Sequence, residues 1–333
     1  MAVKIGINGF GRIGRLVYKA AMADGNFEVV GVNDITDAKT LAHLLKYDST
    51  HGRYPGEVAH EESTIVVNGA KVPVTSERDP ENLPWDKLGA DLVVESTGIF
   101  ATAELLKKHI KAGARKVLLT VPPKDKTGEI KLIVMGVNNS DLNSSDTLVS
   151  NASCTTNCLA PMTKVLHENF GVVHGLMTTI HAYTNDQRTL DMPHKDLRRS
   201  RTAAVSMIPT TTGAARAIGK VIPALNGKLD GLAVRVPTPD GSLTDLTAVL
   251  GKSASAAEIN AAMKKAAEGE LKGILEYTED PIVSIDIVGN PHSCIFDALS
   301  TTTIGDNLVK ILGWYDNEWG YSCRCIDLLK MMA

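Results

Sequence analysis

The 333-residue sequence has little net charge, few cysteines and no long apolar run, and each shortage excludes a class of protein. A net charge of −3 gives no support to a general role in binding nucleic acid or membrane surfaces. No apolar run approaches the roughly 18 residues that a transmembrane helix needs. The opening residues, MAVKIGINGF, lack the regions of a signal peptide and are expected to form a strand. Internal repeats and low-complexity tracts are also missing.

Five cysteines are an odd and low number for a chain of this length. Such a count favours free thiols in a reducing cytoplasm over a disulfide framework. The sequence has no second Cys/His pair at the spacing of zinc ligands, so no metal site is predicted.

The first half of the chain alternates short apolar strands with helices. Strands are expected at 3–9, 27–34, 90–98, 116–120 and 131–137, and helices at 11–23, 38–48 and 101–114. Strands rich in Val, Ile and Leu that alternate with helices are typical of an α/β Rossmann-type domain, in which helices cover both faces of a parallel sheet.

After about residue 150 the pattern changes to longer β-rich runs. The expected strands are GVVHGLMTTIHAY, GLAVRVPTP, LTDLTAVLG, SCIFDALSTTTIG and PIVSIDIVG, the last because Val283, Ile285 and Ile287 alternate with other residues. A helix that begins with the capping box Ser255-x-x-Glu258 is also expected, as is a terminal helix in EWGYSCRCIDLLKMM. These patterns predict an α+β domain with a mixed or antiparallel sheet, and we place the boundary between domains 1–153 and 154–317.

A glycine motif follows the first expected strand. GINGFGRIG places Gly9 at a tight turn, Gly11 where a backbone can approach a pyrophosphate, and Gly14 where a helix must pack closely on a strand. The start of the next helix offers N–H groups to phosphates. Asp34 ends the second strand, where a carboxylate binds ribose hydroxyls and repels a 2′-phosphate. A glycine-rich turn that binds nothing is the alternative, and this context disfavours it.

Three polar residues near this motif are ambiguous. Arg12 lies in the first helical turn, where it could neutralise a pyrophosphate or be a plain surface arginine. Arg78 and Thr120 follow expected strands at the edge where ligands bind in such folds, and each alone is also ordinary loop chemistry.

Cys154 follows the helix-capping residue types of SNAS and is predicted in the first turn of a helix. A helix N-terminus favours a thiolate. At a free pKa near 8.5 about 3% of a thiol is ionised at pH 7, whereas a pKa of about 6 would ionise roughly 90%. Cys158 falls on the same face one turn deeper, where helix geometry is poor for a disulfide. Buried packing is predicted for Cys158, Cys294, Cys323 and Cys325.

A cysteine nucleophile needs a base, and His181 at the end of an apolar strand is the candidate. A hydrogen-bonded core histidine is the alternative and, in isolation, the commoner case. Anion-binding candidates lie in the same half of the chain: Arg235 at a strand end and Thr212 and Gly213 at a helix N-terminus. The basic loop 194–201 is too short for a nucleic-acid site, so a phosphorylated small molecule fits better.

Together, the motifs INGFGRIGR, SNASCTTNCLAP, HAYTNDQ, TTTGAA, RVPTP and WYDNEWGYS resemble the phosphorylating glyceraldehyde-3-phosphate dehydrogenases. The resemblance covers essentially the whole chain in order. The cysteine and C-terminal motifs are highly specific, whereas the glycine motif alone is not.

The resemblance implies a role for each matching position. Cys154 matches the nucleophile and His181 the general base. The matches to cofactor contacts are Arg12, Ile13, Asp34, Arg78, Thr120, Asn317 and Tyr321. Of these, Asn317 matches the residue that fixes the nicotinamide carboxamide, and Tyr321 matches a ring near the nicotinamide. The matches to anion contacts are Thr184 and Arg235 for the substrate phosphate, Ser153, Thr155, Thr212 and Gly213 for inorganic phosphate, and Arg201 as a further contact. The resemblance also implies a homotetramer and a C-terminal helix, 318–333, packed back on the first domain.

The implied reaction is oxidation of D-glyceraldehyde 3-phosphate through a thiohemiacetal and a thioester, which inorganic phosphate resolves to 1,3-bisphosphoglycerate, a step of glycolysis or gluconeogenesis. Ile35 and Pro193 stand where NADP-accepting relatives tend to carry small hydroxyl residues, so NAD is the predicted cofactor. Erythrose-4-phosphate dehydrogenase, which hydrolyses its thioester, is the nearest alternative. A regulatory or RNA-interacting protein is the alternative from another class, and the acidic balance disfavours it.

Overall fold

The computed structural model describes Ala2–Ala333, which fall into two compact units. The first unit comprises the chain up to Ile133, Ser140–Ala152 and Ser322–Ala333. The second comprises Val134–Asn139 and Ser153–Tyr321. The last helix, α8 (Trp319–Met332), therefore contributes most of its length to the first unit.

A nine-stranded sheet forms the centre of the first unit, in the order β10-β11-β9-β8-β1-β2-β7-β6-β5. Its strands are β1 (Val3–Asn8), β2 (Phe27–Asn33), β5 (Val58–Glu61), β6 (Thr64–Val67), β7 (Ala70–Thr75), β8 (Leu92–Glu95), β9 (Lys116–Leu119), β10 (Lys131–Leu132) and β11 (Leu148–Ser150). Every pair from β10 to β7 is parallel, so these strands end at one edge of the sheet. The predicted parallel sheet is confirmed. The antiparallel strands β5 and β6 were not predicted, and the strand expected at 131–137 is only two residues long.

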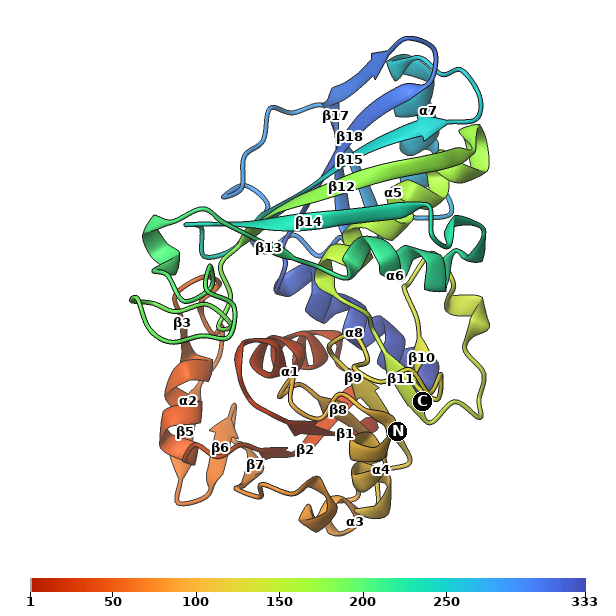
Figure 1. Ribbon diagram of the computed structural model, residues 1–333. Coiled ribbons are helices and arrows are strands. Elements are labelled where there is room, and N and C mark those ends of the chain that lie inside the picture. The colour runs from red at the N-terminus through yellow and green to blue at the C-terminus, as the bar shows by residue number, and fades with distance from the viewer. Residues whose placement is uncertain (1) are drawn as a thin grey trace. The chain divides into compact units, whose positions relative to one another are not determined.

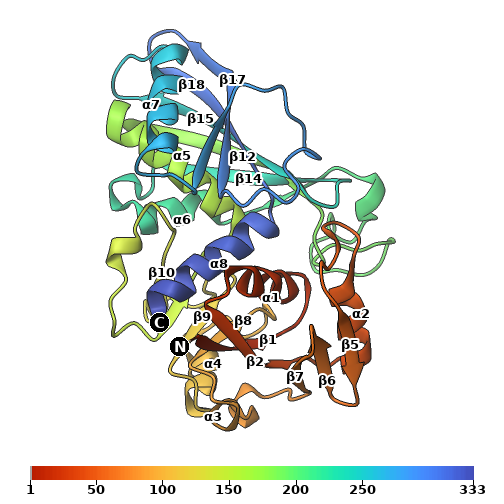
Figure 2. The ribbon, with the colours of Figure 1, turned by 180° about the vertical axis from the view of Figure 1, so that it is seen from behind.

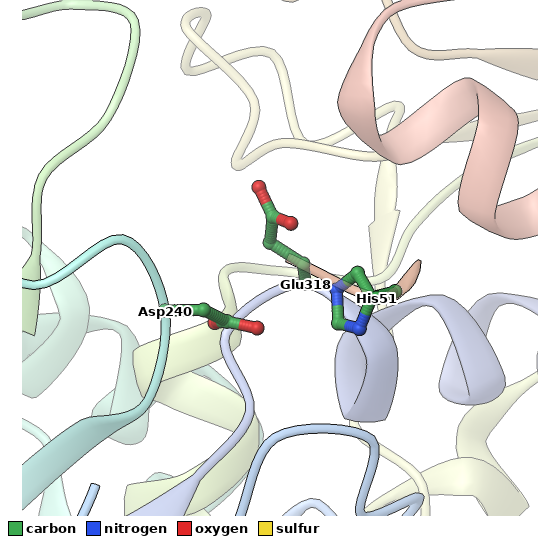
Figure 3. A group of neighbouring side chains, drawn as sticks. All are labelled: His51, Asp240 and Glu318. Carbon is green, nitrogen blue, oxygen red and sulfur yellow. The ribbon is translucent and has the colours of Figure 1, made fainter. Parts of the chain in front are cut away.

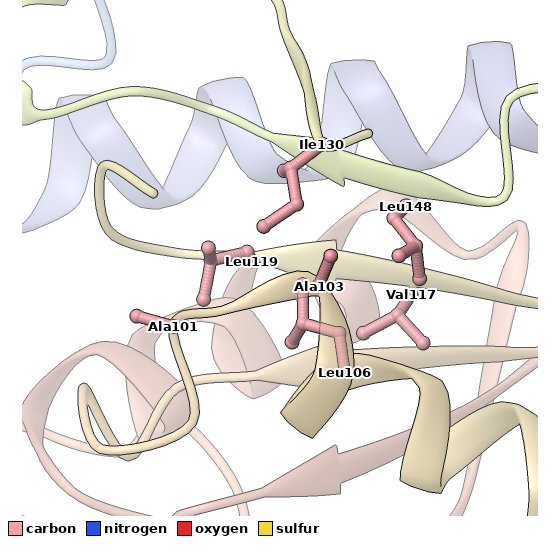
Figure 4. Close-up of a cluster of buried hydrophobic side chains, with 7 residues drawn as sticks. All are labelled: Ala101, Ala103, Leu106, Val117, Leu119, Ile130 and Leu148. Carbon is pink, nitrogen blue, oxygen red and sulfur yellow. The ribbon is translucent and has the colours of Figure 1, made fainter. Parts of the chain in front are cut away.

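Helices cover both faces of this sheet. They are α1 (Arg12–Asp24), α2 (Ala38–Lys46), α3 (Trp85–Leu88) and α4 (Ala103–Lys111). Figures 1 and 2 show α1 and the first-unit part of α8 on one face, and α3 and α4 on the other. Leu106 of α4 packs on Val117 of β9 and Leu148 of β11 in a buried cluster (Figure 4). The same cluster includes Ala101, Ala103, Leu119 and Ile130. A short two-stranded sheet, β3 (Tyr47–Asp48) and β4 (Gly52–Arg53), follows α2.

The second unit contains a seven-stranded sheet in the order β13-β14-β12-β15-β18-β17-β16. Its strands are β12 (Val172–Ala182), β13 (Ile208–Thr211), β14 (Leu229–Val236), β15 (Ser242–Leu250), β16 (Leu275–Thr278), β17 (Cys294–Ile304) and β18 (Leu308–Tyr315). The pairs β12–β14 and β16–β17 are parallel and the others antiparallel, so the predicted mixed sheet is confirmed.

Three helices, α5 (Cys154–Phe170), α6 (Ala214–Val221) and α7 (Ala256–Glu268), lie on one face of this sheet (Figures 1 and 2). Within the described residues, no helix of this unit covers the opposite face. That face leaves large apolar side chains exposed, among them Leu176 at 70% and Leu232 at 44%.

The strand expected at 281–289 is wrong. The segment forms turns, with Val283 56% and Ile285 72% exposed. Asp286 explains the difference, because its carboxylate accepts the N–H of Val283 at 2.8 Å while its own N–H donates to the Val283 carbonyl at 3.0 Å. Such local bonds compete with a strand ladder. Strand β18, which lies between β15 and β17 in the sheet, was not predicted.

None of the helices in Ala2–Ala333 combines the length and the apolar character that a bilayer span demands.

We expect the predicted capping box of α7, which the structure confirms, to stabilise the second unit. Ser255 Oγ accepts the N–H of Glu258 at 3.3 Å, and Glu258 Oε2 accepts the N–H of Ser255 at 2.8 Å. Ser255→Ala should lower the free energy of unfolding by about 1 kcal/mol in a denaturant titration. Ser253→Ala, at an exposed serine before the helix, is the matched control and should change it by less than about 0.5 kcal/mol. Equal effects of the two substitutions would contradict this assignment.

Candidate active site

Cys154 is the first residue of α5, as predicted. Ser153 is the N-cap, and its Oγ accepts the N–H of Thr156 at 3.1 Å. The chain turns sharply into this helix at Ala152, whose φ of 54° lies in the left-handed region that few residues other than glycine adopt. The cap and the turn together fix the thiol at the helix N-terminus. Of the other cysteines, Cys158, Cys294 and Cys325 are buried as predicted, and Cys323 is partly exposed.

His181 lies on β12 with its Nε2 atom 3.4 Å from the Sγ atom of Cys154. The other ring nitrogen, Nδ1, is 2.7 Å from the carbonyl oxygen of Ala182. The carbonyl can only accept, which favours a proton on Nδ1 and leaves Nε2 to accept from the thiol, whereas Arg235 Nη1, which can only donate, also lies against Nδ1 and acts in the opposite direction. The side chains of two residues 27 positions apart are thus in contact, in the arrangement that a nucleophile and its base require.

Desolvation dominates the ionisation of this pair. Burial raises the pKa of the Cys154 thiol to about 11, although Arg235 and the N–H of Thr155 act in the opposite direction. Burial and then Arg235 lower the pKa of His181 to about 3. The helix N-terminus acts in the predicted direction through the N–H of Thr155, but loss of hydration has the larger effect on the pKa of the thiol. At neutral pH the thiol donates to Nε2, and a thiolate forms when that proton moves to His181.

Arg235 lies beside His181, since β12 and β14 pair in parallel with these two residues in register. Its Nη1 donates to the carbonyl oxygen of Ala182 at 3.1 Å and also contacts Nδ1 of His181. Thr184 follows the same end of β12, where its N–H donates to Gln187 Oε1 at 3.1 Å. A cationic group and a hydroxyl residue thus stand at adjacent strand ends, as an anion site requires.

The positions predicted to bind inorganic phosphate lie at two helix starts. Gly213 caps α6 without a side chain, and a Cβ placed there would meet nothing within 4 Å. Thr212 Oγ1 accepts the N–H of Ala214 at 3.2 Å. Thr155 is buried, and its hydroxyl hydrogen-bonds the hydroxyl of Tyr315 at 2.8 Å. Arg201 is exposed and pairs with Asp191 at 2.9 Å.

Two residues that support this site were not predicted. The hydroxyl of Tyr315 also bonds that of Thr179 at 2.9 Å, and its ring meets the His181 ring edge-on at 5.9 Å between centroids. Ser242 accepts the N–H of Ala182 at 3.1 Å and donates to Asn317 Oδ1 at 2.6 Å. Tyr315 lies in the specific motif WYDNEWGYS and could have been found there, whereas Ser242 carries no local signal.

Acidic residues surround Asn317 in the sequence. Asp316 Oδ1 accepts the N–H groups of Glu318 and Trp319 at 2.8 and 2.6 Å and so caps the start of α8. Figure 3 draws Glu318 and Asp240 of this unit, together with His51 of the first unit. Burial, and then the Asp316 carboxylate, raise the pKa of Asp240 well above its usual range. A protonated Asp240 adds no negative charge to the unit that holds the predicted anion contacts.

The glycine motif of the first unit has the geometry that a dinucleotide loop needs. Gly9 has a φ of 89°, and a Cβ there would lie 2.8 Å from the backbone nitrogen of Thr97. A Cβ on Gly14 would lie 2.1 Å from the carbonyl oxygen of Gly9, so the helix packs as closely as predicted. A Cβ on Gly11 would meet nothing within 4 Å, and no side chain caps α1. The open side of Gly11 and the uncapped helix start fit a pyrophosphate.

Asp34 directly follows β2 and is tied to this loop. Its Oδ2 accepts the N–H of Phe10 at 2.8 Å, and its Oδ1 accepts that of Thr36 at 3.1 Å. Arg12 pairs with the buried carboxylate of Asp48 at 2.8 Å, and Ile13 is partly buried beside it.

The other predicted cofactor contacts divide between the units. In the first, Arg78 follows β7 and is exposed, whereas Thr120 follows β9 and is buried, with its Oγ1 donating to the Glu95 carbonyl at 3.0 Å. In the second, Asn317 and Tyr321 are both buried.

We expect His181 to make stability depend on pH. Its pKa falls from an ordinary 6.5 to about 3 on folding, so between these values the unfolded chain binds a proton that the folded one does not. Its contribution to stability is present above pH 6.5 and is lost as the pH falls towards 3, with a slope of up to about 1.4 kcal/mol per pH unit. His181→Gln should flatten this acid limb in unfolding titrations across pH 4–7. His174→Gln, at an exposed histidine of the same strand, is the control. An unchanged limb in His181→Gln would refute this.

Two family models match the chain. Residues 3–103 match the NAD binding domain of glyceraldehyde 3-phosphate dehydrogenase, and residues 153–317 match its C-terminal domain. The chain is 58% identical to glyceraldehyde-3-phosphate dehydrogenase of Geobacillus stearothermophilus, covering 100% of this chain and 99% of the relative. It is 58% identical to the enzyme of that name from Mycobacterium avium, with the same coverage, and 54% identical to that of Salmonella typhimurium, covering 99% and 98%.

Three findings agree on one family. They are the cysteine–histidine contact at a helix start, the glycine loop with the geometry that a dinucleotide needs, and the relatives matched over their full length. The chain belongs to the glyceraldehyde-3-phosphate dehydrogenase family, NAD-dependent oxidoreductases that act on an aldehyde group.

Proposed function

We propose that this protein oxidises D-glyceraldehyde 3-phosphate to 1,3-bisphosphoglycerate with NAD⁺ and inorganic phosphate, in glycolysis or gluconeogenesis. The observation that carries the proposal is the contact between Cys154 Sγ and His181 Nε2 at 3.4 Å. Membership of the family supports it.

The side chains account for the proton movements. His181 Nε2 takes the thiol proton while Cys154 Sγ bonds to the aldehyde carbon, and the proton then passes to the former carbonyl oxygen to give a thiohemiacetal. Conversion of this adduct into a thioester releases a hydride, for which NAD⁺ held by the residues named below would be the acceptor. His181 accepts the hydroxyl proton in the same conversion. A phosphate oxygen then attacks the thioester carbon, the C–S bond breaks, and Cys154 leaves with a proton from His181.

We assign the two phosphates to the two groups of residues described above. Arg235 and Thr184 would bind the phosphate of the substrate, and Arg235 would add a positive charge beside the base. Thr212, Gly213 and Ser153 would bind the attacking phosphate. Thr155, whose hydroxyl also bonds that of Tyr315, would be a further contact of this phosphate. Arg201 would be a further anion contact.

The cofactor contacts follow the same reasoning. The loop of Gly9, Gly11 and Gly14, with Arg12 and Ile13, would bind the pyrophosphate, and Asp34 the adenosine ribose. Arg78 and Thr120 would lie along the adenosine half. Asn317 would hold the carboxamide through its Nδ2, because Ser242 donates to its Oδ1. Tyr321 would lie near the nicotinamide ring.

We expect Cys154→Ser to lose NADH production from glyceraldehyde 3-phosphate by several orders of magnitude and to keep NAD binding, because only covalent chemistry needs the thiol. Cys158→Ala is the control, since that thiol is buried and its Sγ donates to the Gly313 carbonyl at 3.4 Å. It should keep most of the activity. Activity that survives in Cys154→Ser would refute the assignment.

The same assay separates the two aldehyde phosphates. With wild-type protein, turnover of glyceraldehyde 3-phosphate should require inorganic phosphate. If the protein turned over erythrose 4-phosphate faster than glyceraldehyde 3-phosphate, and without inorganic phosphate, the result would instead support erythrose-4-phosphate dehydrogenase activity.

We also propose that the protein acts in the cytoplasm as a homotetramer, without a membrane or a dedicated nucleic-acid partner. The helix-free face of the second sheet supports self-association. It exposes Leu176 and Leu232 on the neighbouring strands β12 and β14, and exposed apolar patches mark protein interfaces.

Sedimentation equilibrium tests the assembly. Leu176→Asp combined with Leu232→Asp would bury two charges in the proposed interface and should lower the mass to that of a smaller species. Leu44→Asp, at an exposed leucine of α2, is the matched control and should leave the mass unchanged. A monomeric wild type, or an unchanged mass of the double variant, would refute the interface.

A further inference from the structure

Four segments of the first unit, three of which carry proposed dinucleotide contacts, each directly follow a residue of one hydrogen-bonded network. Asn8 precedes the loop at Gly9, and Asn33 precedes Asp34. Glu95 precedes the turn at 96–98. The backbone of Glu77 precedes Arg78. None of these four residues has a part in the function proposed above.

Three of the four are the last residues of adjacent parallel strands. Asn8 pairs in register with Asn33 on one side and with Glu95 on the other. Asn33 Nδ2 donates to Asn8 Oδ1 at 2.7 Å, and Asn8 Nδ2 donates to Glu95 Oε2 at 2.6 Å. These side-chain hydrogen bonds therefore connect the ends of the same three strands that backbone hydrogen bonds connect within the sheet.

Glu95 is fully buried and receives four donors. Its Oε2 accepts from Asn8 and lies 3.0 Å from His109 Nε2, and its Oε1 accepts both the N–H, at 2.9 Å, and the hydroxyl of Thr97. Among the described residues, no lysine or arginine pairs with it. A buried carboxylate without a cation is tolerated only when hydrogen bonds satisfy its oxygens.

Trp85 fixes the proton on His109. The indole Nε1–H donates to His109 Nδ1 at 3.1 Å, and an indole can only donate. Nδ1 is therefore an acceptor, so the proton lies on Nε2 and points at Glu95. The Trp85 ring in turn occupies the space over Gly6, where a Cβ would come within 2.6 Å of it.

Asn33 extends the network to a fourth strand. Its Oδ1 accepts the N–H of Glu77 at 2.8 Å and the hydroxyl of Thr75 at 2.9 Å, and its Nδ2 also donates to the Glu77 carbonyl at 2.9 Å. The segment that leads from β7 to Arg78 is therefore tied to the same set of side chains.

We propose that Glu95, oriented by His109 and Trp85, is a positioning residue for the dinucleotide: it holds the four loops at the spacing that the ligand needs. This inference rests on the proposed function. A carboxylate is required because all four partners donate. Glutamine has the same shape, but its NH₂ group would face at least one donor, and an unsatisfied buried group costs about 1–3 kcal/mol. The loops would shift to relieve this conflict, and N–H groups aimed at phosphates would lose their alignment.

The test is equilibrium binding of NAD⁺ to the full chain by calorimetry, compared for wild type and Glu95→Gln. We expect Glu95→Gln to raise the Kd about tenfold, which corresponds to about 1.4 kcal/mol. At saturating NAD⁺, kcat and the KM values for aldehyde and phosphate should stay within about twofold, because the network does not reach Cys154 or its anion contacts.

Leu148→Ala separates positioning from general loss of stability. It opens a cavity in the buried cluster of Figure 4, in the same unit but outside the network. We expect it to lower the denaturant midpoint of unfolding, because it leaves a cavity, and to leave the Kd within twofold. If Leu148→Ala weakens binding as much as Glu95→Gln does, the positioning role is refuted.

If Glu95→Gln does not fold, NAD⁺ binding to Trp85→Phe tests the positioning role instead. Trp85→Phe removes only the donor to His109 and should raise the Kd about threefold or more. A wild-type Kd in either folded variant overturns the inference. Failure of the wild type itself to bind NAD⁺ would overturn the proposed function instead, so the two failures are distinguishable.

Discussion

Loss of hydration at Cys154 and His181 is the constraint on which the chemistry of the second unit depends. Both groups are neutral at physiological pH, because burial opposes the thiolate and the imidazolium alike. The thiol can then be activated only by passing its proton to Nε2. This transfer creates two opposite charges in contact, so their attraction offsets part of the cost that each would carry alone. Two fixed contacts favour that transfer, since the Ala182 carbonyl can accept from Nδ1–H and Cys154 opens helix α5, whereas the positive charge of Arg235 favours the thiolate and opposes the imidazolium.

The first unit deals with a buried charge in the opposite way. Glu95 is as buried as His181, but four donors replace the water that a carboxylate loses. The resulting group is fixed and does not need to change its protonation state. The two units thus use burial for different purposes. In one, loss of hydration keeps both members of a pair neutral and ready to exchange a proton. In the other, complete hydrogen bonding makes a rigid frame.

The sequence predicted what depends on local patterns. The glycine spacing predicted the turn and close packing at Gly9 and Gly14, the residue types before Cys154 predicted the helix start, and Ser255-x-x-Glu258 predicted a cap. It did not predict the pKa of Cys154, because local sequence shows the helix N-terminus but not the side chains that exclude water. The segment 281–289 was mistaken for a strand, since a period-two pattern cannot show that Asp286 closes a turn on Val283. Ser242 acts through Ala182 and Asn317, which are 60 and 75 residues away, and Glu95 connects to Asn8, which is 87 residues away. No local pattern encodes such pairs.

The hydrogen bonds of Ser153 limit how it can bind phosphate. Its hydroxyl accepts the N–H of Thr156 and also lies 2.8 Å from the Thr156 hydroxyl. A serine hydroxyl has one proton and two lone pairs. If Ser153 donates to a phosphate, it can keep both contacts only as an acceptor, so Thr156 must then be the donor between the two hydroxyls. Capping of α5 and binding of phosphate are compatible for this reason. The residue that fixes the nucleophile can also receive the anion that releases the product from it.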